Sequence, residues 1–327
     1  MSANHNGDLG RALAIVDMVA EAGAQAVKLQ TYRADTITID VDGPQFRISA
    51  DHQLWGGDNL YTLYDRAHTP WEWHEAIFDR ARQRHLTVFS SAFDPTAVDL
   101  LELLGTPAYK VASLEIGDIP LLRRMAATGK PIIVSTGAAT PADIDLAVRT
   151  IRQTGNESII VLGCTSSYPA SPEQTSLGSL RLIRDTWDVV TGLSDHTLGI
   201  GVALAGVALG AALVEKHVTL ARADGGVDAA FSLEPAELAS LVIESERAWQ
   251  ASRTARLGPA ASEAESQRLR RSLWVVADVK RGDLVSDDNV RSIRPAGGLE
   301  PRHLDDIRGM VFRQDVARGT PLEWRYL

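Results

Sequence analysis

The feature that most constrains the fold is a repeated alternation of short apolar runs with longer amphipathic segments. Seven runs of four to six residues, rich in Val, Ile, Leu and Ala, have the character of buried parallel strands. They are 26–30, 86–90, 108–112, 132–135, 159–164, 189–193 and 213–217. The unit repeats about every 25 to 30 residues, which predicts βα units and a parallel sheet, either closed into an eight-stranded barrel or open and doubly wound.

Segments with helical spacing lie between and around these runs. They are 9–22, 71–84, 95–104, 119–128, 141–153, 177–185, 200–209 and 235–251. A closed barrel needs an eighth strand, yet the sequence opens with a polar turn at residues 2–8 that leads straight into the first helix. We therefore expect this chain to begin at the C-terminal end of the first barrel strand and to lack most of that strand.

The character of the sequence changes near residue 257. We expect residues 1–256 to form the repeated α/β domain, and residues 257–269, rich in Ala, Ser and Glu, to form a linker without strand pattern. Residues 270–327 have shorter apolar runs between turn signals such as Lys280-Arg281-Gly282-Asp283, which predicts a small β-rich domain.

The charge balance and the cysteine content limit the class of protein. The net charge of −9 argues against a protein that binds nucleic acid or an anionic membrane. The longest apolar stretch, 200–214, is shorter than the roughly 20 residues that span a bilayer. With Cys164 as the one cysteine, no internal disulfide can form, and we expect a reducing, cytoplasmic location.

Two lysines lie inside otherwise apolar strand runs, at positions that a barrel would direct to its mouth. Lys28 and Lys110 would each bury an ammonium group, which is costly without a negative partner. Hydroxyl side chains end the neighbouring runs, and lysines with hydroxyl donors suit a phosphate and a carboxylate. Ion pairs with Glu115, Asp195 or Glu215 are the alternative explanation, and we favour an anionic ligand.

His196 and His217 end adjacent predicted strands. Two imidazoles at neighbouring strand ends can hold a divalent metal with positions open to water and substrate. Hydrogen-bonded structural histidines are the alternative. Cys164, one strand earlier, fits a small core residue better than a third ligand, and His5 is a further candidate contact beside the first strand end.

Several motifs along the chain resemble the sialic acid synthase family. They are Ser2-Ala3-Asn4-His5-Asn6-Gly7, Val27-Lys28-Leu29-Gln30-Thr31, Tyr109-Lys110-Val111-Ala112-Ser113, Ser135-Thr136-Gly137, Cys164-Thr165, Tyr168-Pro169, Leu193-Ser194-Asp195-His196-Thr197-Leu198-Gly199 and Glu215-Lys216-His217-Val218-Thr219. The segment from Arg271 to Pro295 resembles that family's antifreeze-like (SAF) domain. Within the family, Thr69-Pro70-Trp71-Glu72-Trp73-His74 and Asp224-Gly225-Gly226-Val227-Asp228 look most like pseudaminic acid synthases.

The resemblance implies a TIM (β/α)8 barrel followed by the SAF domain, and a phosphoenolpyruvate-dependent nonulosonic acid synthase. Phosphoenolpyruvate would condense with an N-acetylated amino-sugar aldehyde, with 2,4-diacetamido-2,4,6-trideoxy-L-altrose as the best candidate, and phosphate would leave. N-acetylneuraminate and legionaminic acid synthases remain alternatives. From the residues alone, a metal-dependent barrel hydrolase and a non-catalytic carbohydrate-binding protein remain alternatives of other classes.

The resemblance also implies roles for individual residues. Phosphoenolpyruvate would be bound by Lys28, Ser91, Lys110, Ser113, Ser135, Ser166 and Ser194. Ser91 and Ser166 stand where the neuraminate branch has threonine and asparagine. The sugar would be bound by Gln30, Tyr168, Asp228 and Arg294. His196 and His217 would bind Mn²⁺, or Mg²⁺ or Co²⁺, and Glu115 would be the acid/base of the water step. The antifreeze-like domain would cap the barrel of a partner subunit in a homodimer.

Overall fold

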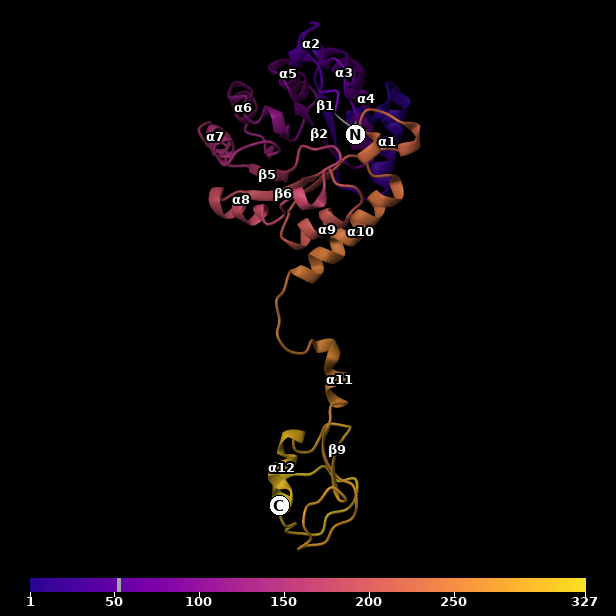
Figure 1. Cartoon of the computed structure of the whole chain (residues 1–327), viewed down its shortest axis with the longest axis vertical. Helices are drawn as coiled ribbons and strands as arrows, with labels where there is room; N and C mark the ends of the chain where they lie inside the picture. Colours follow the sequence, from indigo (N-terminus) through magenta and orange to yellow (C-terminus); the bar gives the residue numbers. More distant parts are fainter. Residues whose placement is uncertain (52–53) are drawn as a thin grey trace. The chain divides into compact units, whose positions relative to one another are not determined.

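The computed structural model describes residues 1–51 and 54–327, which form two compact units, Met1–Thr254 and Ala255–Leu327 (Figure 1). Each unit has its own apolar core. Within the described residues, no helix is long and apolar enough to cross a membrane.

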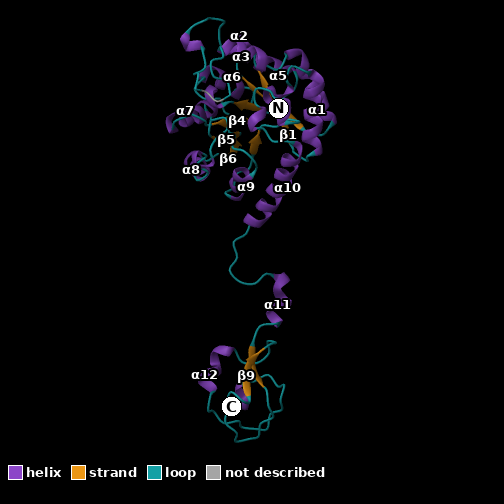
Figure 2. Cartoon of the chain, turned by 45° about the vertical axis from the view of Figure 1, so that its right-hand side comes forward, coloured by secondary structure: helices purple, strands orange, loops and turns teal. Residues whose placement is uncertain are grey.

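The first unit contains a curled sheet of seven parallel strands in which neighbours in sequence are neighbours in space. The strands are β1 (Ala26–Thr31), β2 (Thr87–Ala92), β3 (Tyr109–Val111), β4 (Ile132–Ser135), β5 (Ile159–Cys164), β6 (Val190–Asp195) and β7 (Val214–Lys216). All seven predicted runs are therefore strands, with ends that differ by one or two residues. In Figure 2 the strands lie inside a ring of helices.

Helices connect the strands and cover the outside of the sheet. They are α1 (Leu9–Glu21), α2 (Ala34–Ile37), α3 (Leu60–Ala67), α4 (His74–Gln83), α5 (Pro95–Leu103), α6 (Ile119–Ala126), α7 (Pro141–Arg152), α8 (Ser179–Trp187), α9 (Gly201–Ala208) and α10 (Pro235–Ser252). Proline is the first residue of α5 and α7. The N–H of a first helical residue has no acceptor within the helix, so proline costs no hydrogen bond at this position. Thr140 caps α7 by accepting a hydrogen bond from the Asp143 N–H.

The predicted helix 71–84 differs in detail, because Trp71–Trp73 forms a 3-10 turn and the α-helix begins at His74. Pro70 directly precedes this turn, and its φ of −51° and ψ of 133° are not helical, so the helical turn begins only at Trp71. The apolar faces of the helices pack on the sheet and form the main core, while a small cluster of Phe89, Ile133 and Leu162 lies apart from it.

The sheet does not close, because no described strand pairs β7 with β1. A cavity of about 150 Å³ lies between these two edges. At the carboxyl end of the gap a 3-10 turn, η1 (Ser2–His5), is bound to both sides. The Met1 amino group donates to the Lys28 carbonyl at 2.9 Å, and the Asn4 amide donates to the Val218 carbonyl at 2.8 Å. The turn thereby places Ser2 beside the strand ends that carry the polar residues.

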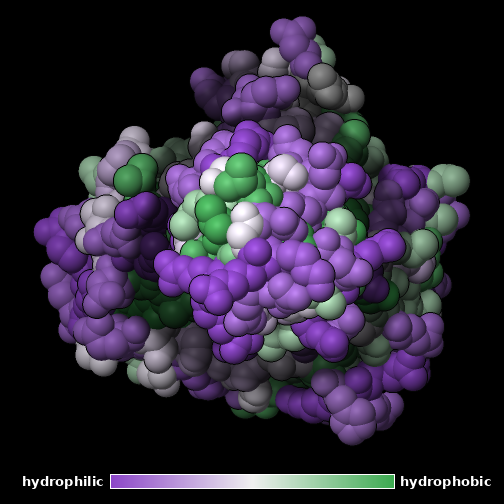
Figure 3. Space-filling view, turned by 90° about the horizontal axis from the view of Figure 1, so that it is seen from below, coloured by the Kyte–Doolittle hydropathy of each residue, from purple (hydrophilic) through white to green (hydrophobic). Residues whose placement is uncertain are grey.

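The second unit is a small β-rich fold with its own core, built around Leu273, Val275, Phe312 and Leu322. Its strands β8 (Ser272–Val275) and β9 (Val290–Ile293) pair antiparallel. Short helices accompany them, namely α12 (Leu304–Ile307), η9 (Pro301–His303) and η10 (Trp324–Tyr326). Figure 3 shows the molecule from below, with a largely hydrophilic surface and several smaller hydrophobic areas.

The segment expected to be a linker without strand pattern contains helical structure. Residues Ala261–Glu263 form a 3-10 turn, η8, that continues into α11 (Ala264–Arg268). The Glu263 carboxylate accepts a hydrogen bond from the Ala260 N–H and so caps the start of this helical stretch. The Ala and Glu content that we took as a linker signature is also the composition of a good helix.

Candidate active site

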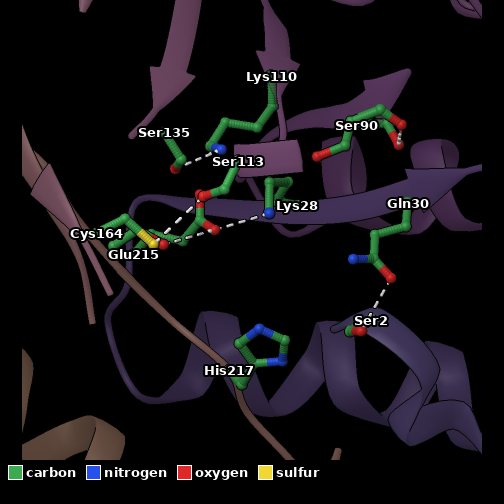
Figure 4. Close-up of polar contacts among 12 residues, drawn as sticks. Ser2, Lys28, Gln30, Ser90, Lys110, Ser113, Ser135, Cys164, Glu215 and His217 are labelled. Atoms are coloured by element: carbon green, nitrogen blue, oxygen red, sulfur yellow. Dashed lines mark hydrogen bonds and ion pairs between the residues drawn. The ribbon is translucent and has the colours of Figure 1, made fainter. Parts of the chain in front are cut away.

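Lys110, in the middle of β3, is the most deeply buried of the candidate lysines. Its side chain is 1% exposed, and its ammonium donates to the Ser135 hydroxyl at 2.7 Å and to the Val111 carbonyl at 2.9 Å (Figure 4). Within residues 1–51 and 54–327 no carboxylate forms an ion pair with it. Burial and the charge of Lys28 lower the pKa of Lys110 to about 8, although the charge of Glu215 opposes this shift. A buried cation that has only neutral partners favours an anionic ligand.

Lys28, on β1, has a carboxylate partner. Its ammonium lies 2.8 Å from Glu215 Oε1, across the gap between β1 and β7. Burial alone would raise the pKa of Glu215, but the charges of Lys28 and Lys110 outweigh it and hold that pKa well below its usual range. The ion-pair explanation is thus what the structure shows for Lys28, while Lys110 has no such partner.

Glu215 was not among our predicted site residues, although it is central to the site. It lies on β7 two residues before His217, so both side chains leave the same face of the strand. The Ser194 hydroxyl, from β6, approaches Glu215 Oε1 at 3.4 Å. This alternation along the strand was the sequence signal that could have identified it.

The serine hydroxyls expected to bind an anion lie around Lys110 and Gly137. The Ser113 hydroxyl accepts a hydrogen bond from the Gly137 N–H at 3.0 Å. A Cβ atom at residue 137 would overlap the Ser166 hydroxyl and would lie 2.7 Å from the Ser113 hydroxyl. Gly137 therefore keeps open the space between these two groups. The Ser91 hydroxyl, fully buried on β2, has no hydrogen-bond partner among the described residues, as expected where a ligand supplies the partner.

His196 and His217 converge as predicted, with ring centroids 5.4 Å apart. His217 Nδ1 is buried without a hydrogen-bond partner in the described part of the chain, and Asp228 Oδ2 lies 3.8 Å from it. Burial, with the charges of His196 and Lys28, places the pKa of His217 well below its ordinary value, so this imidazole is neutral. A neutral imidazole with an unused buried nitrogen is suited to bind a metal ion.

His196 is held in a defined orientation by its neighbours. Its Nδ1 donates to the Thr165 carbonyl at 2.9 Å, which leaves Nε2 as the free ring nitrogen. Burial lowers the pKa of His196, but the Cys164 thiol, 3.9 Å from Nδ1, and the Thr165 carbonyl raise it above its usual value. A cation at Nε2 would therefore compete with a proton. No group of three or more His, Cys, Asp or Glu side chains within the described ranges has metal-binding geometry.

Glu115 follows β3, at the end of the 3-10 turn η4 (Ser113–Glu115). Burial raises its pKa to about 7, against smaller opposing contributions from a backbone hydrogen bond and from Lys110. A carboxyl group that titrates near neutral pH can take and return a proton during a reaction. The acid/base role of Glu115 stays a prediction, and its raised pKa is compatible with it.

A second cavity, of about 360 Å³, lies next to Glu115 and His217. Its polar lining includes Ser2, Gln30, Tyr168 and Asp228, of which the last three were predicted to bind the sugar. The Ser2 hydroxyl donates to Gln30 at 3.0 Å and forms a very short hydrogen bond with Asp228. The turn η1 therefore links two of the predicted sugar-binding residues.

The opposite wall of this cavity is apolar and comes mainly from the segment between β1 and α4. Its side chains are Tyr32, Ile37, Ile48, Trp55, Leu63, Tyr64, Ala67 and Phe93. The Trp55 indole N–H donates to the Val227 carbonyl at 3.0 Å, which fastens this wall to the loop that carries Asp228. We did not predict this wall from the sequence, although Leu60, Leu63, Tyr64 and Ala67 have the i, i+3, i+4, i+7 spacing of the helix α3 that contributes to it.

Two further predicted residues lie elsewhere. His5 is buried, its Nδ1 accepts from the Gly7 N–H at 3.1 Å and its ring meets Trp73 edge-on, so it stabilises the N-terminal turn. Arg294 belongs to the second unit, where it directly follows β9 and is exposed.

The chain is similar to known proteins over nearly its whole length. Residues 15–256 match the NeuB family, and residues 270–325 match the SAF domain. Pseudaminic acid synthase of Helicobacter pylori is 37% identical over 324 residues, 98% of this chain and 94% of that protein. The N,N'-diacetyllegionaminic acid synthase of Campylobacter jejuni is 31% identical over 94% of this chain and 92% of its own length. The crystal structure of an N-acetylneuraminic acid synthetase from Leptospira borgpetersenii, in complex with citrate, superposes with a TM-score of 0.71 at 31% identity over 81% of this chain and 87% of that one.

Proposed function

The chain belongs to the NeuB family, and we propose that it is a phosphoenolpyruvate-dependent nonulosonic acid synthase of the pseudaminic acid type. It would join phosphoenolpyruvate to the aldehyde of an N-acetylated amino sugar, form a nine-carbon 2-keto acid and release phosphate. The observation that supports this most strongly is Lys110, buried without a carboxylate partner beside the hydroxyls that Gly137 leaves accessible.

The anion site is suited to hold phosphoenolpyruvate. Lys28 and Lys110 would supply positive charge, and Ser91, Ser113, Ser135, Ser166 and Ser194 would donate hydrogen bonds to its phosphate and carboxylate. Glu215 limits the attraction of Lys28 for an anion, because the Glu215 carboxylate already neutralises the Lys28 ammonium. An anion that approaches Lys28 must share it with Glu215, whereas Lys110 is available without competition.

His196 and His217 would hold the divalent ion, Mn²⁺ in our proposal, whose chemical contribution is to polarise the aldehyde oxygen. The residues of this chain carry the remaining steps. The enol carbon attacks the aldehyde carbon while Gln30, Tyr168 and Asp228 orient the sugar. Water then adds at C2, Glu115 accepts its proton, and phosphate leaves with cleavage of its C–O bond.

The apolar wall of the second cavity favours a deoxygenated sugar. The sugar 2,4-diacetamido-2,4,6-trideoxy-L-altrose presents three methyl groups, two from its acetamido groups and one at C6. N-acetylmannosamine presents one methyl group and hydroxyls at the other positions. Burying those hydroxyls against Ile37, Ile48 and Leu63 would leave them without hydrogen bonds. We therefore propose the diacetamido trideoxy sugar as the substrate, with legionaminic acid and N-acetylneuraminate precursors as poorer ones.

An aldehyde panel tests the function and separates the alternatives. The purified protein with phosphoenolpyruvate and Mn²⁺ should release phosphate only when an amino-sugar aldehyde is present, and mass spectrometry should find the nine-carbon product. A barrel hydrolase would release phosphate without the sugar, and a carbohydrate-binding protein would release none. We expect kcat/KM for the trideoxy sugar to exceed that for N-acetylmannosamine at least about tenfold, and equal values would contradict the assignment of the wall.

The second unit would contact the sugar that is bound in the barrel of a partner subunit. We propose a homodimer in which the antifreeze-like domain caps the partner's barrel and Arg294 contacts the N-acetylated sugar. An arginine fork suits the polar groups of such a sugar. We also propose a cytoplasmic location, because phosphoenolpyruvate is a cytoplasmic metabolite and Cys164 is the only cysteine.

A further inference from the structure

The most deeply buried ion pair of the described residues lies outside the site, directly behind the two histidines. Lys216 Nζ is 3.0 Å from Asp195 Oδ2, and the two side chains are 2% and 0% exposed. Asp195 ends β6 and Lys216 ends β7, and the two are partners in the strand register. The pair therefore joins the last residues of these neighbouring strands.

Each member of this pair precedes one of the histidines proposed to bind the metal. Asp195 precedes His196, and Lys216 precedes His217. Because successive side chains at a strand end point to opposite faces, the ion pair lies on the helix side while the histidines face the cavity. The same two backbones thus carry an ion pair behind the sheet and an imidazole pair in front of it.

Further hydrogen bonds fix the backbone on both sides of His196. Asp195 Oδ1 accepts from the Thr197 N–H at 2.9 Å, and Lys216 Nζ donates to the Thr197 carbonyl at 2.6 Å. His196 therefore lies between two residues that are both bound to Lys216. A change in this pair would move His196 relative to His217.

Stability alone gives a weak reason for such a pair. Removing two charges from water costs several kcal/mol per ion, and apolar residues of similar volume are often as stabilising or more so. What an ion pair provides and an apolar contact lacks is a fixed direction and distance. We infer that Asp195 and Lys216 are positioning residues that hold His196 and His217 at the separation a shared metal ion requires. This inference rests on the metal site of the proposed function.

Mn²⁺ binding to the metal-free enzyme tests the inference without activity. We expect Asp195→Asn, Lys216→Met and the double variant each to weaken Mn²⁺ affinity about 10- to 100-fold in calorimetric titrations, the range typical of groups that orient metal ligands. The double variant buries no unpaired charge, so it should fold, with an unfolding midpoint lowered only by the loss of the hydrogen bond from Lys216 to the Thr197 carbonyl. Electron spin-echo modulation should find two imidazole nitrogens on Mn²⁺ in the wild type and fewer in the double variant.

A second ion pair of the same barrel provides the control. Glu102→Gln with Lys130→Met removes the pair between α5 and the loop before β4, where the atoms are 2.5 Å apart, and should leave Mn²⁺ affinity unchanged. Wild-type Mn²⁺ affinity in a folded Asp195→Asn/Lys216→Met protein would overturn the inference, provided that His196→Ala and His217→Ala bind weakly. Retained affinity in the two histidine variants would overturn both the metal assignment and the inference.

Discussion

Replacement of Gly137 by alanine should selectively damage phosphoenolpyruvate binding. The backbone at residue 137 does not require positive φ, so alanine is conformationally acceptable there. Its methyl group would overlap the Ser166 hydroxyl and would lie 2.7 Å from the Ser113 hydroxyl. Because Ser166 Cβ is only 3.0 Å from the new methyl group, rotation of the hydroxyls alone relieves the clash incompletely.

The expected size of the effect follows from the hydroxyls that are displaced. A hydrogen bond to a charged group contributes about 1.5 to 3 kcal/mol. Loss of two such bonds to the phosphate corresponds to at least about 3 kcal/mol, which weakens phosphoenolpyruvate binding about 100-fold or more. The lower conformational entropy of the unfolded alanine variant, worth about 0.4 to 1 kcal/mol relative to glycine, should offset part of the strain that this clash causes in the folded state.

The assay is calorimetric binding of phosphoenolpyruvate, together with thermal unfolding of the same sample. Gly178→Ala is a matched control, because Gly178 has a helical φ of −59° and nothing within 4 Å of the added Cβ. That variant should bind phosphoenolpyruvate as the wild type does. A folded Gly137→Ala protein whose affinity stays within about threefold of wild type would refute the placement of the anion between Ser113 and Ser166.

Three other predictions concern the metal, the acid/base residue and the second unit. Chelation should abolish turnover and His217→Ala should weaken Mn²⁺ binding, whereas full activity of the chelated enzyme would contradict a metal requirement. Because burial raises the pKa of Glu115 to about 7, its carboxylate form is lost as pH falls, so kcat/KM should drop about tenfold per pH unit below 7. Glu115→Gln should remove most activity, and a pH profile with the same acidic limb in that variant would assign the limb to another group. Arg294→Ala and His217→Ala proteins, each nearly inactive, should recover about a quarter of wild-type activity when co-expressed, because half of the dimers are mixed and each holds one intact site. Strictly monomeric protein in light scattering would exclude that complementation.

Local sequence pattern was sufficient for the order of the seven strands and for the edge of the sheet that carries the chemistry. Apolar runs of strand length alternate with segments of helical period, and this alternation specifies βα units. Each pattern gathers its apolar residues on one face in only one type of element, a strand or a helix. Since active sites of such folds lie at the carboxyl ends of the strands, the positions of Lys110, His196 and His217 in the sequence already indicated a common site. The convergence of the two histidines needed only the parallel register of β6 and β7.

Partners far apart in the sequence could not be predicted in this way. Lys28 and Glu215 are separated by 187 positions, and only the approach of β1 to β7 decides that this carboxylate neutralises Lys28 while Lys110 is left without one. The role of Gly137 depends on two serines from other loops, and the apolar cavity wall depends on the approach of the segment between β1 and α4 to the loop that carries Asp228. Sequence therefore determined which groups reach the carboxyl edge of the sheet, since that follows from local periodicity. Tertiary structure decided which charges are paired and which space stays open, because both depend on distances between segments that local pattern does not encode.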